Sequence, residues 1–209
     1  PAIRTRKQNP KDDVISHLLE QGYSGIEILT ECITYAAAGM ATTREFISAS
    51  AWHLLENPTL RQQYLAADEI ERHAILHELL RLEPVVGHLL RRTQQDLHIH
   101  HGNQTTTIPA GSLVDIHIHN TNADPAAVGE DPERYCPHRN LAQGVQPYAM
   151  SFGDGHHRCP GSYIAIQETD IFLTRLLALP NLRMQTPPEL SWNELVKGYE
   201  IRGFHIELA

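Results

Sequence analysis

The most constraining feature of this sequence is a run without proline from Ser24 to Asn57. Ser24 can cap a helix, and Glu27 three residues later completes a capping box. Pro58 ends the run, because proline disfavours a helical conformation in the residue before it. The pattern predicts a helix of more than 30 residues, which is well above the usual length and should cross the whole body of a protein.

In the rest of the chain, the spacing of apolar residues changes around Pro84. Apolar residues recur with helical spacing before it, whereas alternating and then irregular patterns follow it. Residues 121–158 are rich in Pro, Gly, Asp and Asn, as long functional or disordered stretches often are. Apart from the long helix, we expect helices from Asn9 to Gly22 and over 59–66, 68–82 and 161–179, a hairpin over 96–108, and strands over 112–120, 182–184 and 201–208. This is a mainly α chain with small β-sheets.

Composition narrows the class of protein. The chain has 209 residues and a formal net charge of −8, so it can bury a core and is unsuited to non-specific nucleic-acid binding. Its three cysteines cannot all pair with one another, which favours a reducing compartment such as the cytoplasm. No membrane span or signal peptide is expected. The first residue is Pro1, which indicates a processed product or part of a longer chain.

The strongest chemical signal is the segment from Ser151 to Gly161, SFGDGHHRCPG, directly before a predicted helix. Cys159 would lie just before the helix N-terminus, where unpaired N–H groups and the helix dipole stabilise a thiolate. Pro160 suits the first helical position. Glycines allow tight turns and close backbone approach to a flat ligand. The alternative is a small buried cysteine at a helix start, and the flanking pattern makes that alternative the weaker one.

This segment resembles the haem-binding loop of the cytochrome P450 family, whose pattern is F-G-x-G-x-H/R-x-C-x-G. The matching positions are Phe152, Gly153, Gly155, His157, Cys159 and Gly161. The resemblance implies the C-terminal half of the P450 fold, with haem b held by Cys159 as the axial thiolate of the iron. It also implies that His157 binds a haem propionate.

A second match is Glu78-Leu79-Leu80-Arg81, in which the i,i+3 spacing places Glu78 and Arg81 on one helix face. Taken alone, this pair is more often an exposed salt bridge of about 0–1 kcal/mol. In the family it is the E-x-x-R pair, buried by a meander that supplies another arginine. Residues 131–139 resemble that meander, with Arg139 as the third member. The implied role is a desolvated charge network that holds the cysteine loop in place.

A third match lies in the long helix, at Ala38-Gly39-Met40-Ala41-Thr42-Thr43. A mid-helix glycine costs about 1 kcal/mol relative to alanine, and a threonine hydroxyl can bond to the carbonyl one turn back. These residues could simply form a stripe of small side chains packed against another helix. The resemblance instead implies that Ala38, Gly39 and Thr42 roof the haem, with Thr42 hydrogen-bonding bound dioxygen. Most members carry an acid where this chain has Ala41, so peroxide-driven, slow or lost turnover is plausible.

Weaker matches extend the resemblance over essentially the whole chain. Arg91 falls where relatives often place a propionate-binding arginine, and Arg92 could serve instead. Val85 and Val86 match a segment that lines the substrate pocket, and residues 201–204 resemble the last β-turn, whose tip often touches substrate. As one haem-binding region over 1–209, the chain divides into a connector (1–9), a helical part with the long central helix (10–83), a β-rich part (84–120), the meander and cysteine loop (121–160), and a helix with terminal strands (161–209).

Histidine is unusually frequent, at 14 residues. Alternate histidines on a strand share a face, so the groups His98/His100/His101 and His117/His119 on neighbouring strands could make a zinc or nickel site. No regular ligand motif is present. Solvated surface histidines are the more common outcome for such residues.

The resemblance implies a monooxygenase of the P450 type that inserts one oxygen atom into a small lipophilic substrate. The resemblance implies electrons from a ferredoxin or flavodoxin docking near His156 and Arg158, in a soluble bacterial enzyme without nucleic-acid or membrane partners. The family's N-terminal half has no counterpart here. The alternatives are therefore a haem-binding or partner-binding protein without activity, or one half of a split or cleaved P450.

Overall fold

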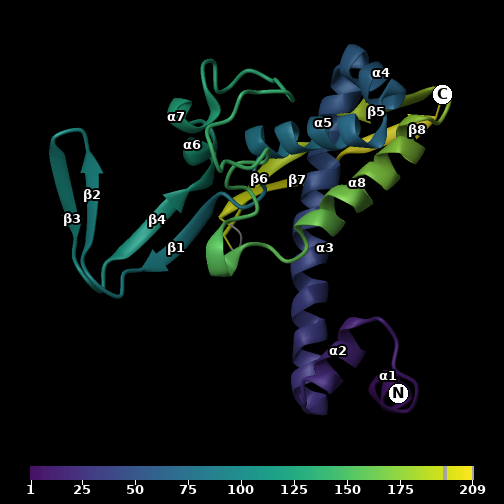
Figure 1. Ribbon diagram of the computed structural model, residues 1–209. Coiled ribbons are helices and arrows are strands. Elements are labelled where there is room, and N and C mark those ends of the chain that lie inside the picture. The colour runs from purple at the N-terminus through teal and green to yellow at the C-terminus, as the bar shows by residue number, and fades with distance from the viewer. Residues whose placement is uncertain (195–196, 209) are drawn as a thin grey trace. The chain divides into compact units, whose positions relative to one another are not determined.

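The computed structural model describes residues 1–194 and 197–208, apart from the side chain of His101. The chain forms two compact units, Pro1–Arg44 and Glu45–Ala209, and each is considered by itself (Figure 1). The sequence-based prediction of a single haem-binding region over the whole chain stays a prediction.

The first unit contains α1 (Ala2–Gln8), α2 (Val14–Glu20) and the beginning of α3 (Gly25–Glu56). Residues 1–9 were expected to be a connector, which stays a prediction, and residues 2–8 of it form the helix α1. Good helix formers fill this segment, and Arg6 and Lys7 in its last turn suit the helix dipole. Helix α2 starts at Asp13, whose carboxylate accepts a hydrogen bond from the Ser16 amide at 2.9 Å.

The long helix is confirmed, with 32 residues in α3. Its start is the predicted capping box: the Ser24 amide donates to the Glu27 carboxylate at 2.7 Å, and the Glu27 amide donates to the Ser24 hydroxyl at 3.4 Å. Within the first unit Ile28 is fully buried, whereas Ile26 and Met40 on the same helix are largely exposed.

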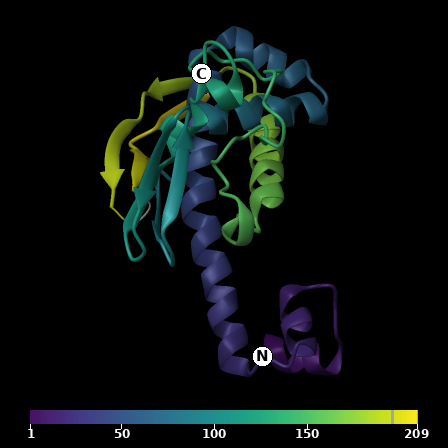
Figure 2. The same ribbon diagram turned by 60° about the vertical axis from the view of Figure 1, so that its left-hand side comes forward.

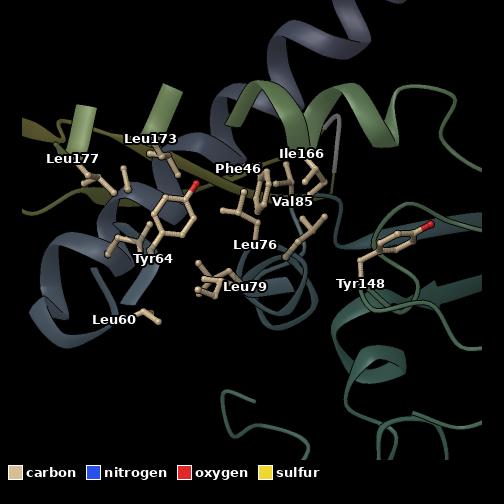
Figure 3. Close-up of a cluster of buried hydrophobic side chains, with 14 of the residues drawn as sticks. Phe46, Leu60, Tyr64, Leu76, Leu79, Val85, Tyr148, Ile166, Leu173 and Leu177 are labelled. Carbon is tan, nitrogen blue, oxygen red and sulfur yellow. The ribbon is translucent and has the colours of Figure 1, made fainter. Parts of the chain in front are cut away.

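The second unit is built around four helical segments: the end of α3, α4 (Pro58–Ala66), α5 (Glu69–Leu82) and α8 (Ser162–Leu177). Asn57 and Asp68 cap α4 and α5, as helix starts of this kind require. Their apolar faces form one core, drawn in Figure 3, whose fully or nearly fully buried members include Leu54, Tyr64, Leu76, Leu173 and Leu177. Burial of such side chains contributes about 1.5–3 kcal/mol each.

The strands of the second unit form antiparallel pairs, which gather on one side of the unit while α8 lies on the other (Figure 2). The described pairs are β1 (His88–Arg92) with β4 (Leu113–His117), β2 (Leu97–His101) with β3 (Gln104–Ile108), β5 (Leu182–Thr186) with β8 (His205–Leu208), and β6 (Glu189–Asn193) with β7 (Gly198–Arg202). The hairpin around Gly102-Asn103 is confirmed, with His98 opposite Thr107 and His100 opposite Thr105.

Three details of the strand predictions are wrong. The strand expected over 112–120 ends at His117, because His117 caps the short helix α6 (Ile118–Asn122). The strand expected over 201–208 is broken at Gly203, whose φ of 63° turns the chain between β7 and β8. Strands β1 and β6 were not predicted, since neither shows clear apolar alternation and each depends on a partner strand.

The irregular stretch contains only short helices, α7 (Pro125–Val128) and the 3₁₀ turn η1 (Gly155–His157). The fold class is confirmed as mainly helical with small antiparallel sheets. Over the described residues, none of the helices combines the length and the apolar character that crossing a bilayer requires.

Candidate functional site

The segment from Ser151 to Gly161 folds into a tight loop that brings Cys159 back against Phe152. The Cys159 amide donates to the Phe152 carbonyl at 2.8 Å, and η1 lies inside the loop. Gly153 and Gly155 have φ values of 68° and 62°, a region that side chains other than glycine rarely adopt. A Cβ on Gly153 would also lie 3.4 Å from the His157 carbonyl oxygen. The two glycines are therefore required by the path of the backbone.

Cys159 lies just before α8 and carries a free, half-buried thiol. Helix α8 begins at Ser162 with Gly161 as its N-cap, so the prediction that Pro160 takes the first helical position is wrong. The cysteine amide is already turned back to Phe152, and the chain enters the helix only after Gly161. A Cβ on Gly161 would lie 3.9 Å from the Cys159 Sγ, which places the sulfur beside the first turn of α8.

Aromatic side chains pack against the cysteine loop. The rings of Phe152 and Tyr148 meet edge to face at 4.8 Å between centroids, and the Arg158 guanidinium donates to the Tyr148 hydroxyl at 2.7 Å. The ring of His77 on α5 also meets Tyr148 edge to face, at 5.5 Å between centroids. Burial, together with a smaller effect of the neighbouring His73, lowers the pKa of His77 to about 4. His77 is therefore neutral at pH 7, whereas His157 on the loop is exposed.

Strand β1 runs beside the loop, because a Cβ on Gly153 would lie 4.0 Å from the Cδ1 of Leu89. Alternate residues share one face of a strand, so Arg91 lies on the same face as Leu89 and Arg92 on the opposite face. The Arg92 guanidinium also donates to the Gly111 carbonyl at 2.6 Å. The sequence offered Arg91 or Arg92 as the propionate-binding arginine. Of the two, Arg91 lies on the strand face that is turned to the cysteine loop.

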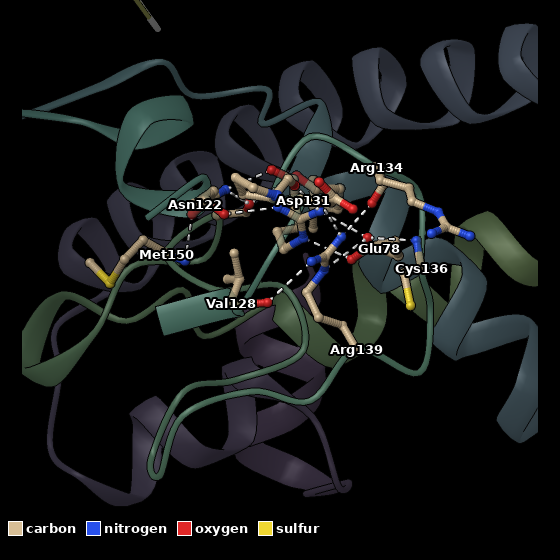
Figure 4. A network of polar contacts seen from close by, with 12 residues as sticks. Glu78, Asn122, Val128, Asp131, Arg134, Cys136, Arg139 and Met150 are labelled. Atoms are coloured by element: carbon tan, nitrogen blue, oxygen red, sulfur yellow. Dashed lines mark hydrogen bonds and ion pairs between the residues drawn. The ribbon is translucent and has the colours of Figure 1, made fainter. Parts of the chain in front are cut away.

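Glu78 is the centre of a buried charge network (Figure 4). Arg81 donates two hydrogen bonds to its carboxylate, at 2.7 and 2.8 Å, and the Cys136 amide donates a third at 2.9 Å. The Arg139 guanidinium forms an ion pair with the same carboxylate at 3.5 Å. Glu78 and Arg81 are 3% and 1% exposed, so the solvated surface pair is excluded and the buried network is present.

Both arginines also hold the surrounding irregular backbone. Arg81 donates to the carbonyls of Asn122 and Pro132, at 2.8 and 2.7 Å. The carbonyl oxygens that accept hydrogen bonds from Arg139 are those of Val128, Glu130, Asp131 and Arg134. These carbonyls belong to a segment with little secondary structure, so the guanidinium groups supply the donors that strands or helices would otherwise provide.

Asn122, at the end of α6, connects this network to the cysteine loop. It is 1% exposed, and its side-chain amide donates to the Arg81 carbonyl and to the Ser151 hydroxyl, both at 2.9 Å. Its side-chain oxygen accepts the Met150 amide at 2.8 Å, and the Ser151 hydroxyl donates to the Leu80 carbonyl at 2.9 Å. Sequence reasoning missed Asn122. The only signal was an amide in an irregular stretch, whose partners are far away in the sequence.

Comparison with known proteins identifies this arrangement. The family model described as "Cytochrome P450" matches residues 3–198. The chain belongs to the cytochrome P450 family. It is 30% identical over 198 residues to "Putative cytochrome P450 133B2" of Xylella fastidiosa, covering 92% of this chain and 47% of that protein. It is also 30% identical over 187 residues to "Biotin biosynthesis cytochrome P450" of Bacillus subtilis, covering 87% and 45%.

Solved P450 structures share the fold. The structure of CYP109E1 from Bacillus megaterium in complex with corticosterone has a TM-score of 0.81 and 26% identity, covering 99% of this chain and 55% of that one. P450BioI in complex with an acyl carrier protein ligated to hexadec-9Z-enoic acid has a TM-score of 0.79 and 27% identity, covering 100% and 52%. The chain spans about half the length of the P450 relatives that it matches.

Membership in the P450 family implies a haem cofactor, and the cysteine loop fits one. It presents one free thiol, the ligand type that P450 iron takes. Its glycine turns leave no side chain between the backbone and a flat ligand at Gly153 and Gly155. Arg91 on the loop-facing side of β1 and His157 on the loop supply donors suited to carboxylate groups. Within 1–194 and 197–208, no three His, Cys, Asp or Glu residues form a cluster able to hold a metal ion.

The residues matched to the oxygen-binding groove lie on α3, in the first unit. The Thr42 hydroxyl donates to the Ala38 carbonyl at 2.8 Å, which is the bond to the preceding turn that the sequence suggested. Ala38 and Gly39 are exposed, and a Cβ on Gly39 would meet no atom outside its own helix within 4 Å. Gly39 is therefore not required by packing in this unit. The roles of these three residues stay predictions.

The segment that links α5 to β1 contains the two residues assigned to the substrate pocket. Val85 is 5% exposed and packs in the core of the second unit, whereas Val86 is half-buried. Gly87 and Gly198 hold this segment against β7, since a Cβ on either one would lie only 2.0–2.1 Å from a backbone oxygen of the other segment. The pocket role of both valines stays a prediction.

The histidine groups do not lie on neighbouring strands, so that part of the prediction is wrong. His98 and His100 lie on β2, which pairs with β3, whereas His117 lies on β4, which pairs with β1. His119 is in the short helix α6. The side chain of His101 lies outside the described part of the chain.

Proposed function

We propose that this chain is a haem-thiolate monooxygenase that inserts one oxygen atom from O2 into a small lipophilic substrate. The observation that carries the proposal is the Cys159 loop, with a half-buried free thiol whose backbone is held through Asn122 to the buried Glu78 network. A bound haem b supplies the oxygen-activating chemistry, for which the thiolate donates electron density.

The residues of the chain have separate tasks in this proposal. Cys159 would bind the haem iron, and Gly153 and Gly155 would let the backbone approach the flat ring. Arg91 and His157 would bind the propionates, for which a guanidinium and an imidazole are suitable donors. The Phe152 carbonyl holds the cysteine amide, and Tyr148 and Phe152 keep water from the underside of the loop.

The family resemblance assigns Ala38, Gly39 and Thr42 of the first unit to the binding of dioxygen. The Thr42 hydroxyl can hold a proton donor there, but Ala41 provides no carboxyl group to pass protons to it. We therefore infer slow turnover with O2 and a comparatively good peroxide-driven reaction. An Ala41→Glu variant should raise O2-driven turnover and leave peroxide-driven turnover nearly unchanged.

The proposal also includes a substrate class and an electron donor. Apolar ligands accompany two structural neighbours, corticosterone in one and a fatty acyl group on a carrier protein in the other. These two ligands, and the apolar side chain of Val86 in the segment that links α5 to β1, support a small lipophilic substrate. Electrons come from a ferredoxin or flavodoxin that docks near the exposed His156 and Arg158.

The experiment that tests this function is haem reconstitution followed by turnover with a surrogate ferredoxin and reductase under ¹⁸O2. The proposal expects one ¹⁸O atom in the oxidised product and none with Cys159→Ser. Arg91→Ala should weaken haem binding more than Arg92→Ala, which is the matched control. Haem that binds equally well to Cys159→Ser would contradict the proposal.

A second candidate is one half of a split or cleaved P450, or a haem-binding or partner-binding protein without activity. Large apolar side chains exposed on α8 support it, namely Tyr163, Ile164 and Phe172, which are 65%, 57% and 49% exposed. This candidate expects the isolated chain to bind haem without forming product. Intact mass of the purified protein shows whether residues precede Pro1, and activity restored by an added complementary half separates a split enzyme from an inactive binder.

A further inference from the structure

The hairpin formed by β2 and β3 carries two histidines that the proposed monooxygenase function does not use. His98 and His100 are alternate residues of β2 and therefore share one face of the hairpin. Both side chains are exposed, so neither one is needed for the core. Thr107 and Thr105 lie directly opposite them on β3.

Each histidine contacts the threonine that faces it. The Nδ1 of His98 lies 2.8 Å from the Thr107 hydroxyl oxygen, and the Nδ1 of His100 lies 2.9 Å from the Thr105 hydroxyl oxygen. In the tautomer that carries the proton on Nδ1, both rings donate to these hydroxyl groups and both Nε2 atoms keep a free lone pair. Metal-binding histidines are oriented in this way, with one ring nitrogen hydrogen-bonded and the other free to coordinate.

We propose that His98 and His100 form a two-histidine chelate site for one divalent transition-metal ion such as Zn²⁺ or Ni²⁺, completed by water. Alternate residues of a strand lie about 6.6 Å apart, which lets two imidazole rings converge on an ion bound at about 2.1 Å from each nitrogen. Two neutral nitrogen donors favour zinc, nickel and copper over magnesium and calcium. The site is open and has only two protein ligands, so it binds more weakly than a structural zinc site.

The test is calorimetric titration of the full chain with ZnCl2 and, separately, NiCl2. One ion is expected per chain. His98→Gln and His100→Gln should each weaken binding by about tenfold or more, and the double variant should remove it. Thr105→Val and Thr107→Val keep the strand and the shape of the side chain, and should each weaken binding severalfold because the ring loses its orienting partner.

His205→Gln is the matched control, since His205 is an exposed histidine on another strand, β8. It should leave the affinity and the one-to-one ratio unchanged. Unchanged binding in the double histidine variant, an equal loss in the His205 control, or full affinity in both threonine variants would overturn the proposal. None of these measurements depends on haem, so the outcome is independent of the monooxygenase proposal.

Discussion

Two buried carboxylates, Glu78 and Asp170, bind arginines of the same helix, α5, but they organise different kinds of structure. Asp170 of α8 accepts two hydrogen bonds from Arg72, at 2.7 and 3.0 Å, and one from the Tyr64 hydroxyl at 2.5 Å. This network joins α4, α5 and α8, three helices that already share an apolar core. Glu78 and its arginines instead hold irregular backbone that has few contacts of its own.

The two networks indicate where a buried ion pair contributes most to the structure. A charge pair between packed helices adds to contacts that exist without it, and replacing such pairs by apolar residues is often harmless. A charge pair among loops provides hydrogen bonds that nothing else in the structure replaces. We therefore expect loss of Glu78 to disorder the cysteine loop, and loss of Asp170 to lower stability without that effect.

The largest effect is expected for Glu78→Gln. This change leaves the buried Arg81 and Arg139 without their counter-charge, which typically costs about 3–5 kcal/mol. Urea denaturation followed by circular dichroism measures the stability, and haem titration measures the state of the loop. Glu71→Gln is the matched control on the same helix, because Glu71 contacts the exposed His138. It should cost less than about 1 kcal/mol, and an equal cost for both variants would contradict the comparison.

Asp170→Asn should destabilise by about 2–4 kcal/mol, less than Glu78→Gln because Arg72 is partly exposed. Hydrogen exchange at the Met150 amide should stay as in the original chain. Burial opposes ionisation of Asp170, but hydrogen bonds from Arg72 and Tyr64 outweigh it and hold its pKa below the ordinary value. This contribution to stability is present above the unfolded pKa and is lost as the pH falls through the folded one, so the variant should show a flatter acid limb. Faster exchange in the loop would show that the two networks are not separate.

Asn122→Ala removes the link between the Glu78 network and the cysteine loop. It removes the acceptor of the Met150 amide and the donor to the Arg81 carbonyl and the Ser151 hydroxyl, at an expected cost of about 1–3 kcal/mol. The expected signature is local: faster hydrogen exchange at residues 150–159 with little change in α4 or α8. Asn120→Ala, at an exposed position of the same short helix, is the control. Uniform loss of protection over the whole second unit would contradict a local role.

The last expected effect is confined to acidic pH and is caused by His77, which lies on α5 between Arg72 and Glu78 in the sequence. Its pKa of about 4 is below the unfolded value of 6.5, so the unfolded chain binds more protons between these two values. Stability should therefore fall as the pH drops from 6.5 to 4, by at most about 1.4 kcal/mol per pH unit. His77→Gln should flatten this region. A slope that is unchanged in His77→Gln would show that other groups cause it.

Features that depend on residues close together in the sequence were predicted, whereas features that depend on distant residues were mostly missed. The cysteine loop was predictable because its pattern is contained in eleven residues, from Ser151 to Gly161. The pairing of Glu78 with Arg81 follows from helix spacing, but its burial was available only through the family resemblance, since the covering segment begins about forty residues later. Helix boundaries set by caps, such as Ser24 and Asp68, were close to those observed.

The missed features depend on distant partners. The role of Asn122 rests on contacts with Arg81 and Met150, which lie 41 and 28 residues away. The Asp170 network joins residues 98 and 106 positions apart, and no local pattern distinguishes Asp170 from a solvated acid on α8. Strand β1 was missed for the same reason, because it is defined by its pairing with β4.

The most direct test of the account is the carbon-monoxide difference spectrum of the reduced, haem-loaded chain, recorded beside Cys159→Ser and Glu78→Gln. A Soret maximum at the long-wavelength position of thiolate-ligated haem is expected for the original chain. The serine variant should lose this maximum, and Glu78→Gln should lose it together with most of the bound haem. A thiolate-type spectrum that survives in Cys159→Ser, or haem bound normally to Glu78→Gln, would contradict the assignment of the ligand or of its supporting network.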